Sequence, residues 1–158
     1  MNKKMRISGK TLLAAAAISG ALASVPARAE TPQAVTITTQ VVFNPSISGT
    51  FTASDPVCSS GVIELVSEKV TSGNAFNINT QTRFVCDDNS GSFVLRYHPQ
   101  VVGRDSEGFD LDGPWSVSPG LGTGAYENLR GSGWFGVVLD WATDPLEAVE
   151  TFVGFMTP

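Results

Sequence analysis

The sequence predicts an all-β protein: a single antiparallel barrel of about eight strands, with a sandwich as the alternative, tied by one disulfide. Three observations predict this fold. Apolar and polar residues alternate with a period of two along most of the chain after residue 30, and no long segment has helical periodicity. Turn-forming residues separate the alternating segments at short intervals. The chain also contains two cysteines, the number that a single bridge needs.

The first 29 residues have the organisation of a secretory signal peptide. Basic residues precede an uncharged stretch at 11–25, and small side chains precede the expected cleavage point between Ala29 and Glu30. The uncharged stretch is shorter than the roughly 20 residues that a membrane-spanning helix needs. We therefore expect a signal peptide at 1–29, a single barrel domain at 30–158, and a secreted or periplasmic location with no membrane span after cleavage.

The charge that remains after cleavage argues against one class of partner. Residues 30–158 keep five of the ten basic residues and all fifteen acidic ones, a net charge of −10. Such a chain repels phosphate backbones, so we expect no nucleic-acid partner.

Cys58 and Cys86 are expected to pair, because an exported chain folds in an oxidising compartment. A metal site is the alternative, but His98 is the single histidine that could complete it, and we expect no metal or other cofactor.

Eight segments are expected to form strands. They lie at 35–43, 49–53, 62–69, 75–86, 91–101, 115–118, 134–142 and 149–156. The acidic segment at 103–114 is expected to be a loop, because it is rich in aspartate and glycine. In the third segment, alternation puts Glu64 and Glu68 together on the face opposite Ile63.

The best-defined unit is the hairpin around the turn at 87–90, whose Asp and Asn residues favour a turn. A four-residue turn there brings Phe84 opposite Phe93. It also brings Thr82 opposite Leu95 and puts the apolar faces of both strands on the same side. Burial of that side therefore predicts the register.

The most distinctive segment is the glycine-rich stretch at 119–133. A phosphate-binding loop is one interpretation, but no Lys-Ser/Thr pair and no long helix follow the glycines, so nucleotide binding is not expected. The alternative is a structural turn in which Tyr126 and Leu129 share a face and plug one end of the barrel.

The residues of this turn resemble the signature of the allene oxide cyclase and dirigent-type barrels; they are Gly122, Gly124, Tyr126, Leu129, Arg130 and Gly131. Together with the segment at 49–53 and the positions of the two cysteines, they make the chain similar to small exported bacterial proteins of unknown function. The resemblance implies an eight-stranded antiparallel barrel. No catalytic residue of the plant members matches a position here, so the resemblance implies no specific activity.

Several polar residues are candidates for chemistry, and a solvated surface role is favoured for them. His98 has no activated serine motif to complete a catalytic triad. Glu64 and Glu68 would lie roughly 13 Å apart on a strand, too far for a glycosidase pair. The acidic loop with Asp105 and Asp112 lacks the spacing of an EF-hand calcium site.

Arg83 and Arg96 share one face of the hairpin, with His98 nearby. They would form an anion site only if that face lined the barrel, and a solvent-facing position is favoured because the other face is the apolar one. We therefore assign no catalytic residue from the sequence.

The aromatic residues indicate where a ligand would bind. The candidates for lining a ligand pocket are Phe84, Tyr97, Trp115 and Trp134. Packing in the core or as a plug of the barrel is the favoured role for Tyr97, Trp115, Trp134 and Trp141, and pocket lining in a hollow barrel is the alternative. The sequence favours a non-enzymatic exported protein whose partner is a small apolar molecule or an extracellular or periplasmic protein. A cyclase- or isomerase-like enzyme is the alternative, on the resemblance alone. A hollow apolar interior favours binding, buried ionisable groups in a cavity favour catalysis, and a filled interior excludes both.

Overall fold

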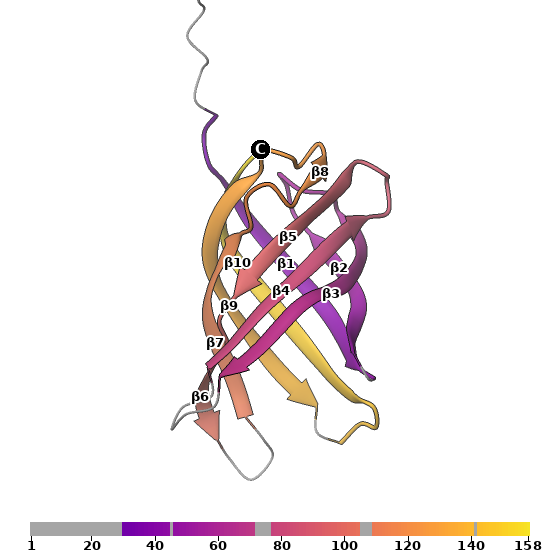
Figure 1. Ribbon diagram of the computed structural model, residues 1–158, viewed down its shortest axis with the longest axis vertical. Helices are drawn as coiled ribbons and strands as arrows, with labels where there is room; N and C mark the ends of the chain where they lie inside the picture. Colours follow the sequence, from indigo (N-terminus) through magenta and orange to yellow (C-terminus); the bar gives the residue numbers. More distant parts are fainter. Residues whose placement is uncertain (1–29, 45, 72–76, 105–108, 141) are drawn as a thin grey trace, which may run out of the picture.

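Eight strands close into an antiparallel barrel in the computed structural model, which describes residues 30–44, 46–71, 77–104, 109–140 and 142–158 (Figure 1). The strands of the barrel are β1 (Gln33–Phe43), β2 (Ile47–Ala53), β3 (Ser60–Thr71), β4 (Asn77–Cys86), β5 (Gly91–Tyr97), β7 (Phe109–Val117), β9 (Arg130–Asp140) and β10 (Leu146–Thr157). Their order is β7-β9-β10-β1-β2-β3-β4-β5, and pairing of β5 with β7 closes the ring. Two short strands, β6 (Gln100–Arg104) and β8 (Thr123–Gly124), pair with β7 and β5. The predicted barrel is confirmed.

Some of the sequence predictions concern residues outside the described ranges. These are the signal peptide at 1–29 with its cleavage after Ala29, the acidic residues at 105–108, and Trp141. They stay predictions. In the part of the chain that the structure describes, no helix is long and apolar enough to cross a membrane.

The hairpin of β4 and β5 has the register that burial predicts. Phe84 pairs with Phe93, and Thr82 pairs with Leu95. In the turn, Asn89 has a φ of 60°, a left-handed conformation that asparagine tolerates better than most residues. A slip of one residue would turn the apolar face of one strand outwards, so local alternation is sufficient to select this register.

The acidic segment at 103–114 is strand over all of its described part, so the loop prediction is wrong there. β6 ends at Arg104, and β7 begins at Phe109. Leu111 of β7 pairs with Val137 of β9, and Trp115 pairs with Tyr97 of β5. The aspartates that alternate with these apolar residues resemble a loop in the sequence. Pairing on both edges of β7 outweighs that local preference.

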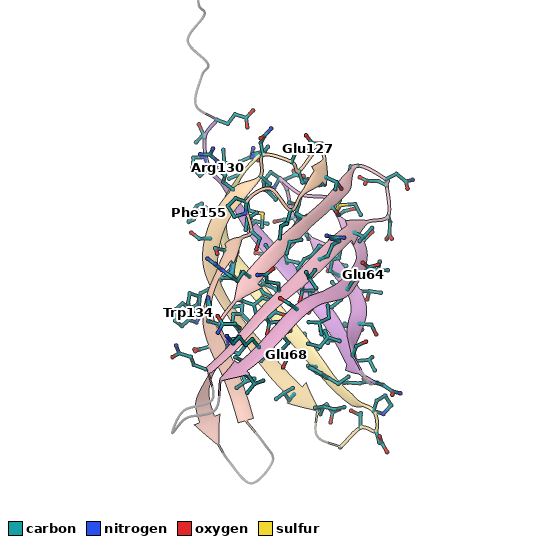
Figure 2. The ribbon with its side chains drawn as sticks, viewed as in Figure 1. Glu64, Glu68, Glu127, Arg130, Trp134 and Phe155 are labelled. Atoms are coloured by element: carbon teal, nitrogen blue, oxygen red, sulfur yellow. A yellow bond between two sulfur atoms is a disulfide. The ribbon has the colours of Figure 1, made fainter. Side chains whose placement is uncertain are left out.

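A β-bulge in β3 changes the side of the sheet to which its later residues point. The register with β4 shifts just after Leu65. Glu68 consequently pairs with Thr80, whose side chain is buried inside the barrel, whereas Glu64 pairs with Arg83 on the outside. The prediction that Glu64 and Glu68 share a face is therefore wrong, and Figure 2 shows where both lie.

Aromatic side chains fill the half of the barrel that lies nearer the disulfide. Phe84 and Phe93 stack with their ring centroids 5.0 Å apart. Phe51 meets Phe84 edge-on at 5.2 Å, and Phe152 meets it edge-on at 6.0 Å. All four side chains are at most 2% exposed, so this half of the interior is a packed core.

Two glycines make room for Trp115 in the wall of this core. Gly133 and Gly154 lie opposite each other on β9 and β10. A Cβ atom would lie 2.8 Å from the Trp115 Nε1 atom at Gly133, and 2.7 Å from the Cζ2 atom at Gly154. The indole N–H donates to the carbonyl oxygens of Trp134 and Val153, each at 3.1 Å. The glycines therefore let the indole approach the backbone of both strands.

Candidate functional site

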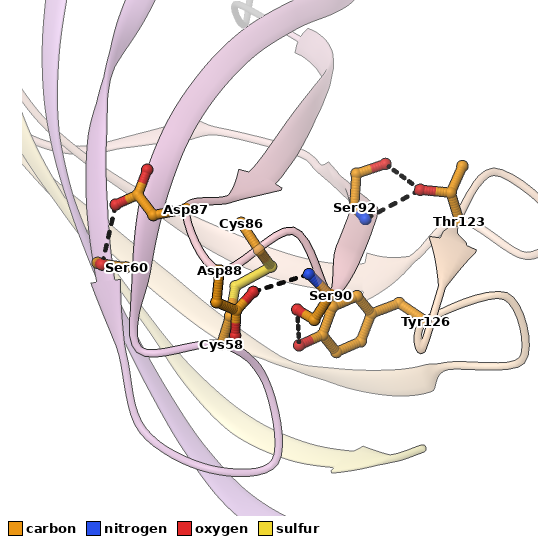
Figure 3. Close-up of a disulfide and its surroundings, with 9 residues drawn as sticks. All are labelled: Cys58, Ser60, Cys86, Asp87, Asp88, Ser90, Ser92, Thr123 and Tyr126. Atoms are coloured by element: carbon orange, nitrogen blue, oxygen red, sulfur yellow. Dashed lines mark hydrogen bonds between the residues drawn. A yellow bond between two sulfur atoms is a disulfide. The ribbon is translucent and has the colours of Figure 1, made fainter.

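A disulfide and several side-chain hydrogen bonds hold one end of the barrel together (Figure 3). Cys58 lies in the β2–β3 connection and is bonded to Cys86 at the end of β4, with their Cα atoms 5.9 Å apart. The predicted disulfide is confirmed. Beside it, the Ser60 hydroxyl donates to the Asp87 carboxylate at 3.0 Å. The bridge thus joins the β2–β3 connection to the end of β4, at the end of the barrel that the aromatic core fills.

The glycine-rich segment covers the same end. Tyr126 and Leu129 are 7% and 3% exposed, and the Tyr126 ring lies edge-on to Phe93 with the centroids 5.5 Å apart. The Tyr126 hydroxyl forms a 3.1 Å hydrogen bond with the hydroxyl of Ser90 in the β4–β5 turn. The segment therefore acts as a cap on the aromatic core.

The remaining residues of the glycine-rich turn that resemble the family signature also belong to this cap. Gly124 has a φ of +60°, and a Cβ atom there would lie 2.3 Å from the Ser90 carbonyl oxygen, so only glycine fits without strain. Gly122 and Gly131 are half-buried, and Arg130 is exposed. None of these residues lines the cavity at the opposite end of the barrel.

That cavity has a volume of about 80 Å³ and opens at the end of the barrel away from the disulfide. Its wall is mostly apolar and is formed by Phe43, Ile47, Glu68, Ile78, Thr80, Tyr97, Pro99, Leu111, Phe135, Val137, Leu139 and Glu150. The rings of Tyr97 and Phe135, with centroids 4.9 Å apart, separate it from the aromatic core. A cavity of this size holds several water molecules or a ligand of about five non-hydrogen atoms.

A buried carboxyl group lies in the wall of the cavity. Glu150 of β10 is 6% exposed, and its Oε2 atom accepts a 3.0 Å hydrogen bond from the Thr39 hydroxyl of β1. The Tyr97 hydroxyl of β5 lies 3.5 Å from the other oxygen, Oε1. It is also 3.0 Å from the Thr82 hydroxyl of β4. Side chains from four strands therefore form this hydrogen-bond network. Within it, the hydrogen bond to Oε1 is longer and weaker than the one to Oε2.

The environment of this network shifts two pKa values. Burial raises the pKa of Glu150 to about 7, because the charged carboxylate loses its hydration, while hydrogen bonds from Thr39 and Tyr97 act in the opposite direction. Burial also raises the pKa of Tyr97 well above its usual value, and the negative charge of Glu150 adds to that shift. Tyr97 therefore stays a neutral hydrogen-bond partner, whereas Glu150 exchanges its proton near neutral pH.

The raised pKa of Glu150 predicts that its contribution to folding stability falls as the pH rises from about 4.5 to about 7. In that window the folded protein keeps the Glu150 proton and the unfolded chain releases it, so the folded state binds more protons. The contribution is fully present below a pH of about 4.5, and up to about 3 kcal/mol is lost once the pH passes about 7. Urea unfolding over this pH range measures the effect.

Glu150→Gln removes the titrating group, and its stability relative to wild type is expected to increase over the same pH range. Glutamine has nearly the same shape and still offers an oxygen to the Thr39 hydroxyl. Glu147→Gln is the matched control, because Glu147 lies on the exposed side of the same strand. If the difference in free energy of unfolding between wild type and Glu150→Gln does not change with pH, the raised pKa of Glu150 is contradicted.

The bulge in β3 brings a second carboxyl group to the mouth of the cavity. Glu68 is exposed but lines the cavity, and its negative charge also raises the pKa of Tyr97. The described lining residues include no lysine, arginine or histidine. Among the described residues, no three His, Cys, Asp or Glu side chains are grouped as they would be around a metal ion. The site therefore combines an apolar wall, a tyrosine hydroxyl and two carboxyl groups.

Of the four aromatic candidates for lining a ligand pocket, three lie inside the barrel and one of these, Tyr97, lines the cavity. Phe84 and Trp115 belong to the packed core. Trp134 is 52% exposed on the outer face, so the prediction for this residue is wrong (Figure 2). The reason is the alternation of β9, which turns Phe135 inwards and its neighbour outwards.

The polar candidates on the hairpin lie away from the cavity. Arg96 is exposed and Arg83 is half-buried, and both belong to the outer face of β4 and β5. His98 is half-buried just after β5, and its backbone N–H donates to the Pro114 carbonyl oxygen at 3.2 Å. The condition for an anion site inside the barrel, that the face with the arginines lines the interior, is not met.

Sequence reasoning missed Glu150, although a signal for it exists. In β10 the buried residues are Ala148, Glu150, Phe152 and Met156, which are all even-numbered. Alternation alone therefore assigns this carboxyl group to the interior, and an acidic residue on an otherwise apolar face is an informative exception. Glu68 has no such signal, because the bulge that turns it inwards is not visible in the sequence.

Comparisons with known proteins do not assign the chain to a family. It matches no protein-family model, no curated protein and no solved structure. The resemblance to allene oxide cyclase and dirigent-type barrels therefore stays a prediction, and the function has to be argued from the cavity itself.

Proposed function

We propose that this protein binds a small, mostly apolar molecule in the cavity at the open end of the barrel and does not convert it. The observation that carries the proposal is an apolar-walled cavity with a buried hydrogen-bonding pair, Glu150 and Tyr97, in its wall. Small-molecule sites commonly have this composition, since the apolar wall removes the ligand from water and a few polar groups orient it.

Two features of the barrel favour this cavity over other positions. The aromatic rings of the disulfide end leave the interior packed, so the open end is where the interior can admit a ligand. A larger groove, of about 300 Å³, lies outside β1, β9 and β10 near Val138 and Glu147. None of the residues that line this groove is a buried polar side chain, so it lacks the fixed hydrogen-bonding groups that give specificity.

The test compares two tryptophan substitutions on neighbouring positions of β9. Leu139 lines the cavity, whereas Val138 is 66% exposed on the outside. We expect Leu139→Trp to fill the cavity and Val138→Trp to leave it open. Wild type and both variants are produced with their own N-terminal segment and examined by native mass spectrometry. The expected result is a bound small molecule on wild type and Val138→Trp and its absence from Leu139→Trp.

A bound molecule that persists at the same occupancy on Leu139→Trp would overturn the assignment of the cavity. An unliganded mass for wild type in this experiment would count against binding altogether. Circular dichroism of both variants checks that the barrel remains folded.

An enzyme that transfers a proton is the second candidate, because Glu150 has a pKa of about 7 and lies in an open cavity beside the Tyr97 hydroxyl. A carboxyl group of this kind can serve as a general base or acid in an isomerase- or cyclase-like reaction. The molecule released from the protein distinguishes the candidates. If unliganded wild type converts this molecule and Glu150→Gln does not, the enzyme is supported. If the molecule is recovered unchanged after incubation with either protein, a binding protein is supported.

We also propose that the protein works outside the cytoplasm, in a secreted or periplasmic location. The disulfide between Cys58 and Cys86 supports this, since such bridges persist in oxidising compartments. The signal-peptide pattern at 1–29 supports the same location.

A further inference from the structure

We infer that the ligand of the barrel cavity is a small primary amine in its protonated form, with its ammonium group against Glu150 and its apolar body along the wall. This inference rests on the proposed function, because it specifies the chemistry of the ligand at the same cavity.

The hydrogen bonds of Glu150 leave room for a donor from the ligand. Its Oε2 atom accepts a 3.0 Å hydrogen bond from Thr39, but the Tyr97 hydroxyl is 3.5 Å from Oε1. A carboxylate accepts up to about four hydrogen bonds, and 3.5 Å is long for a bond between two oxygens. An ammonium group carries three N–H donors and can therefore complete the coordination of Oε1.

The charges around the cavity also favour an ammonium group on the ligand. Glu150 and Glu68 are the acidic groups among the described lining residues, and no basic side chain stands among them. Lys69 follows Glu68 but pairs with Asn79 on the outer side of β3 and β4. A buried carboxylate without a cationic partner is costly, and a ligand that brings the cation offsets that cost. A carboxylate or phosphate ligand would meet repulsion instead.

The remaining wall limits the size and polarity of the body of the ligand. Apart from the two carboxyl groups, the cavity is lined mainly by aliphatic and aromatic side chains, among them Ile47, Leu111 and Leu139. Its volume of about 80 Å³ suits an alkyl group of a few carbon atoms. Apolar contact with this wall and a charge-assisted hydrogen bond at Glu150 together describe a short alkylamine.

The test uses three probes that share a branched alkyl group: isobutylamine, 2-methylpropan-1-ol and isobutyrate. Dissociation constants are measured by NMR titration of the oxidised protein at a pH of about 8, where an alkylammonium keeps its proton and Glu150 is mostly ionised. Among the described residues, the titratable groups that share the cavity wall with Glu150 are Tyr97 and Glu68. We expect the amine to bind about tenfold more tightly than the alcohol, and isobutyrate to bind more weakly than both.

Variants of three glutamates locate the effect. Glu150→Gln is expected to remove the preference for the amine over the alcohol. Glu68→Gln is expected to reduce it several-fold, and because Glu68 is exposed this variant keeps the test independent of any folding defect at the buried position. Glu64→Gln, on the outer face of the same strand, is the matched control and should leave all three dissociation constants unchanged.

The outcomes separate the inference from the proposed function. If the alcohol binds as tightly as the amine, and filling the cavity with Leu139→Trp abolishes both, the cavity binds ligands but the amine assignment is overturned. A preference for the amine that survives Glu150→Gln and Glu68→Gln also overturns it. If none of the three probes shifts the resonances of cavity residues, both the inference and small-ligand binding at this site fail.

Discussion

Phe152→Ala is expected to lower the free energy of unfolding by about 3 to 5 kcal/mol. Phe152 is 0% exposed and lies at the centre of the barrel, stacked on Phe135 with the centroids 5.4 Å apart. Tyr97 and Trp115 meet its ring edge-on, at 5.2 and 6.5 Å. The substitution removes buried apolar surface and leaves a space that the rigid wall of strands cannot close. Urea unfolding monitored by tryptophan fluorescence measures the change.

Phe155→Ala is the matched control for this prediction. Phe155 lies three residues further along β10 and is 61% exposed on the outer face (Figure 2). Its loss is expected to change the free energy of unfolding by no more than about 0.5 kcal/mol. Similar effects of the two substitutions would contradict the assignment of Phe152 to the packed core. Because Tyr97 contacts Phe152, the core variant should also weaken ligand binding in the neighbouring cavity.

Removal of the disulfide has the second largest expected effect. The double variant Cys58→Ala/Cys86→Ala is expected to lower the free energy of unfolding by about 3 to 4 kcal/mol. The bridge spans a sequence separation of 28 and therefore restricts the unfolded chain over β3 and β4. Equilibrium unfolding in urea, under oxidising conditions, measures the difference.

A reducing agent provides the control for the disulfide prediction. It should destabilise wild type to about the level of the double variant and leave the double variant unchanged. Wild type that unfolds at the same urea concentration with and without reductant would refute the expected contribution. The reduced protein should still form the β4–β5 hairpin, because that register follows from the pairing of apolar residues such as Phe84 and Phe93.

Much of the architecture was accessible from local patterns. The alternation in 75–86 and 91–101 predicts the pairing of Phe84 with Phe93, because a slip of one residue would expose one apolar face. The segment at 103–114 was not accessible in this way. Its aspartates and its Gly-Pro pair have low strand propensity, and the strand forms because Leu111 and Trp115 find partners on β9 and β5.

The residues of the candidate site also differ in whether a local sequence pattern could predict their positions. Glu150 was accessible in principle, because it has the same parity as the buried Phe152. Glu68 was not, since a bulge depends on how two strands match over their whole length. The prediction for Trp134 was wrong because it relied on the common burial of large aromatic residues. The alternation of β9 turns the neighbouring Phe135 inwards and Trp134 outwards.

By itself, the sequence determined the all-β character, the disulfide partners, the hairpin register and the inward parity of Glu150. These are local properties, set by the period-two geometry of a strand and by the presence of two cysteines. Only the tertiary structure decided that β5 pairs with β7 to close the ring, that Glu68 turns to the mouth, and that one end is packed while the other holds a cavity. These features depend on contacts between segments far apart in the chain and on how side-chain volumes fill a closed barrel.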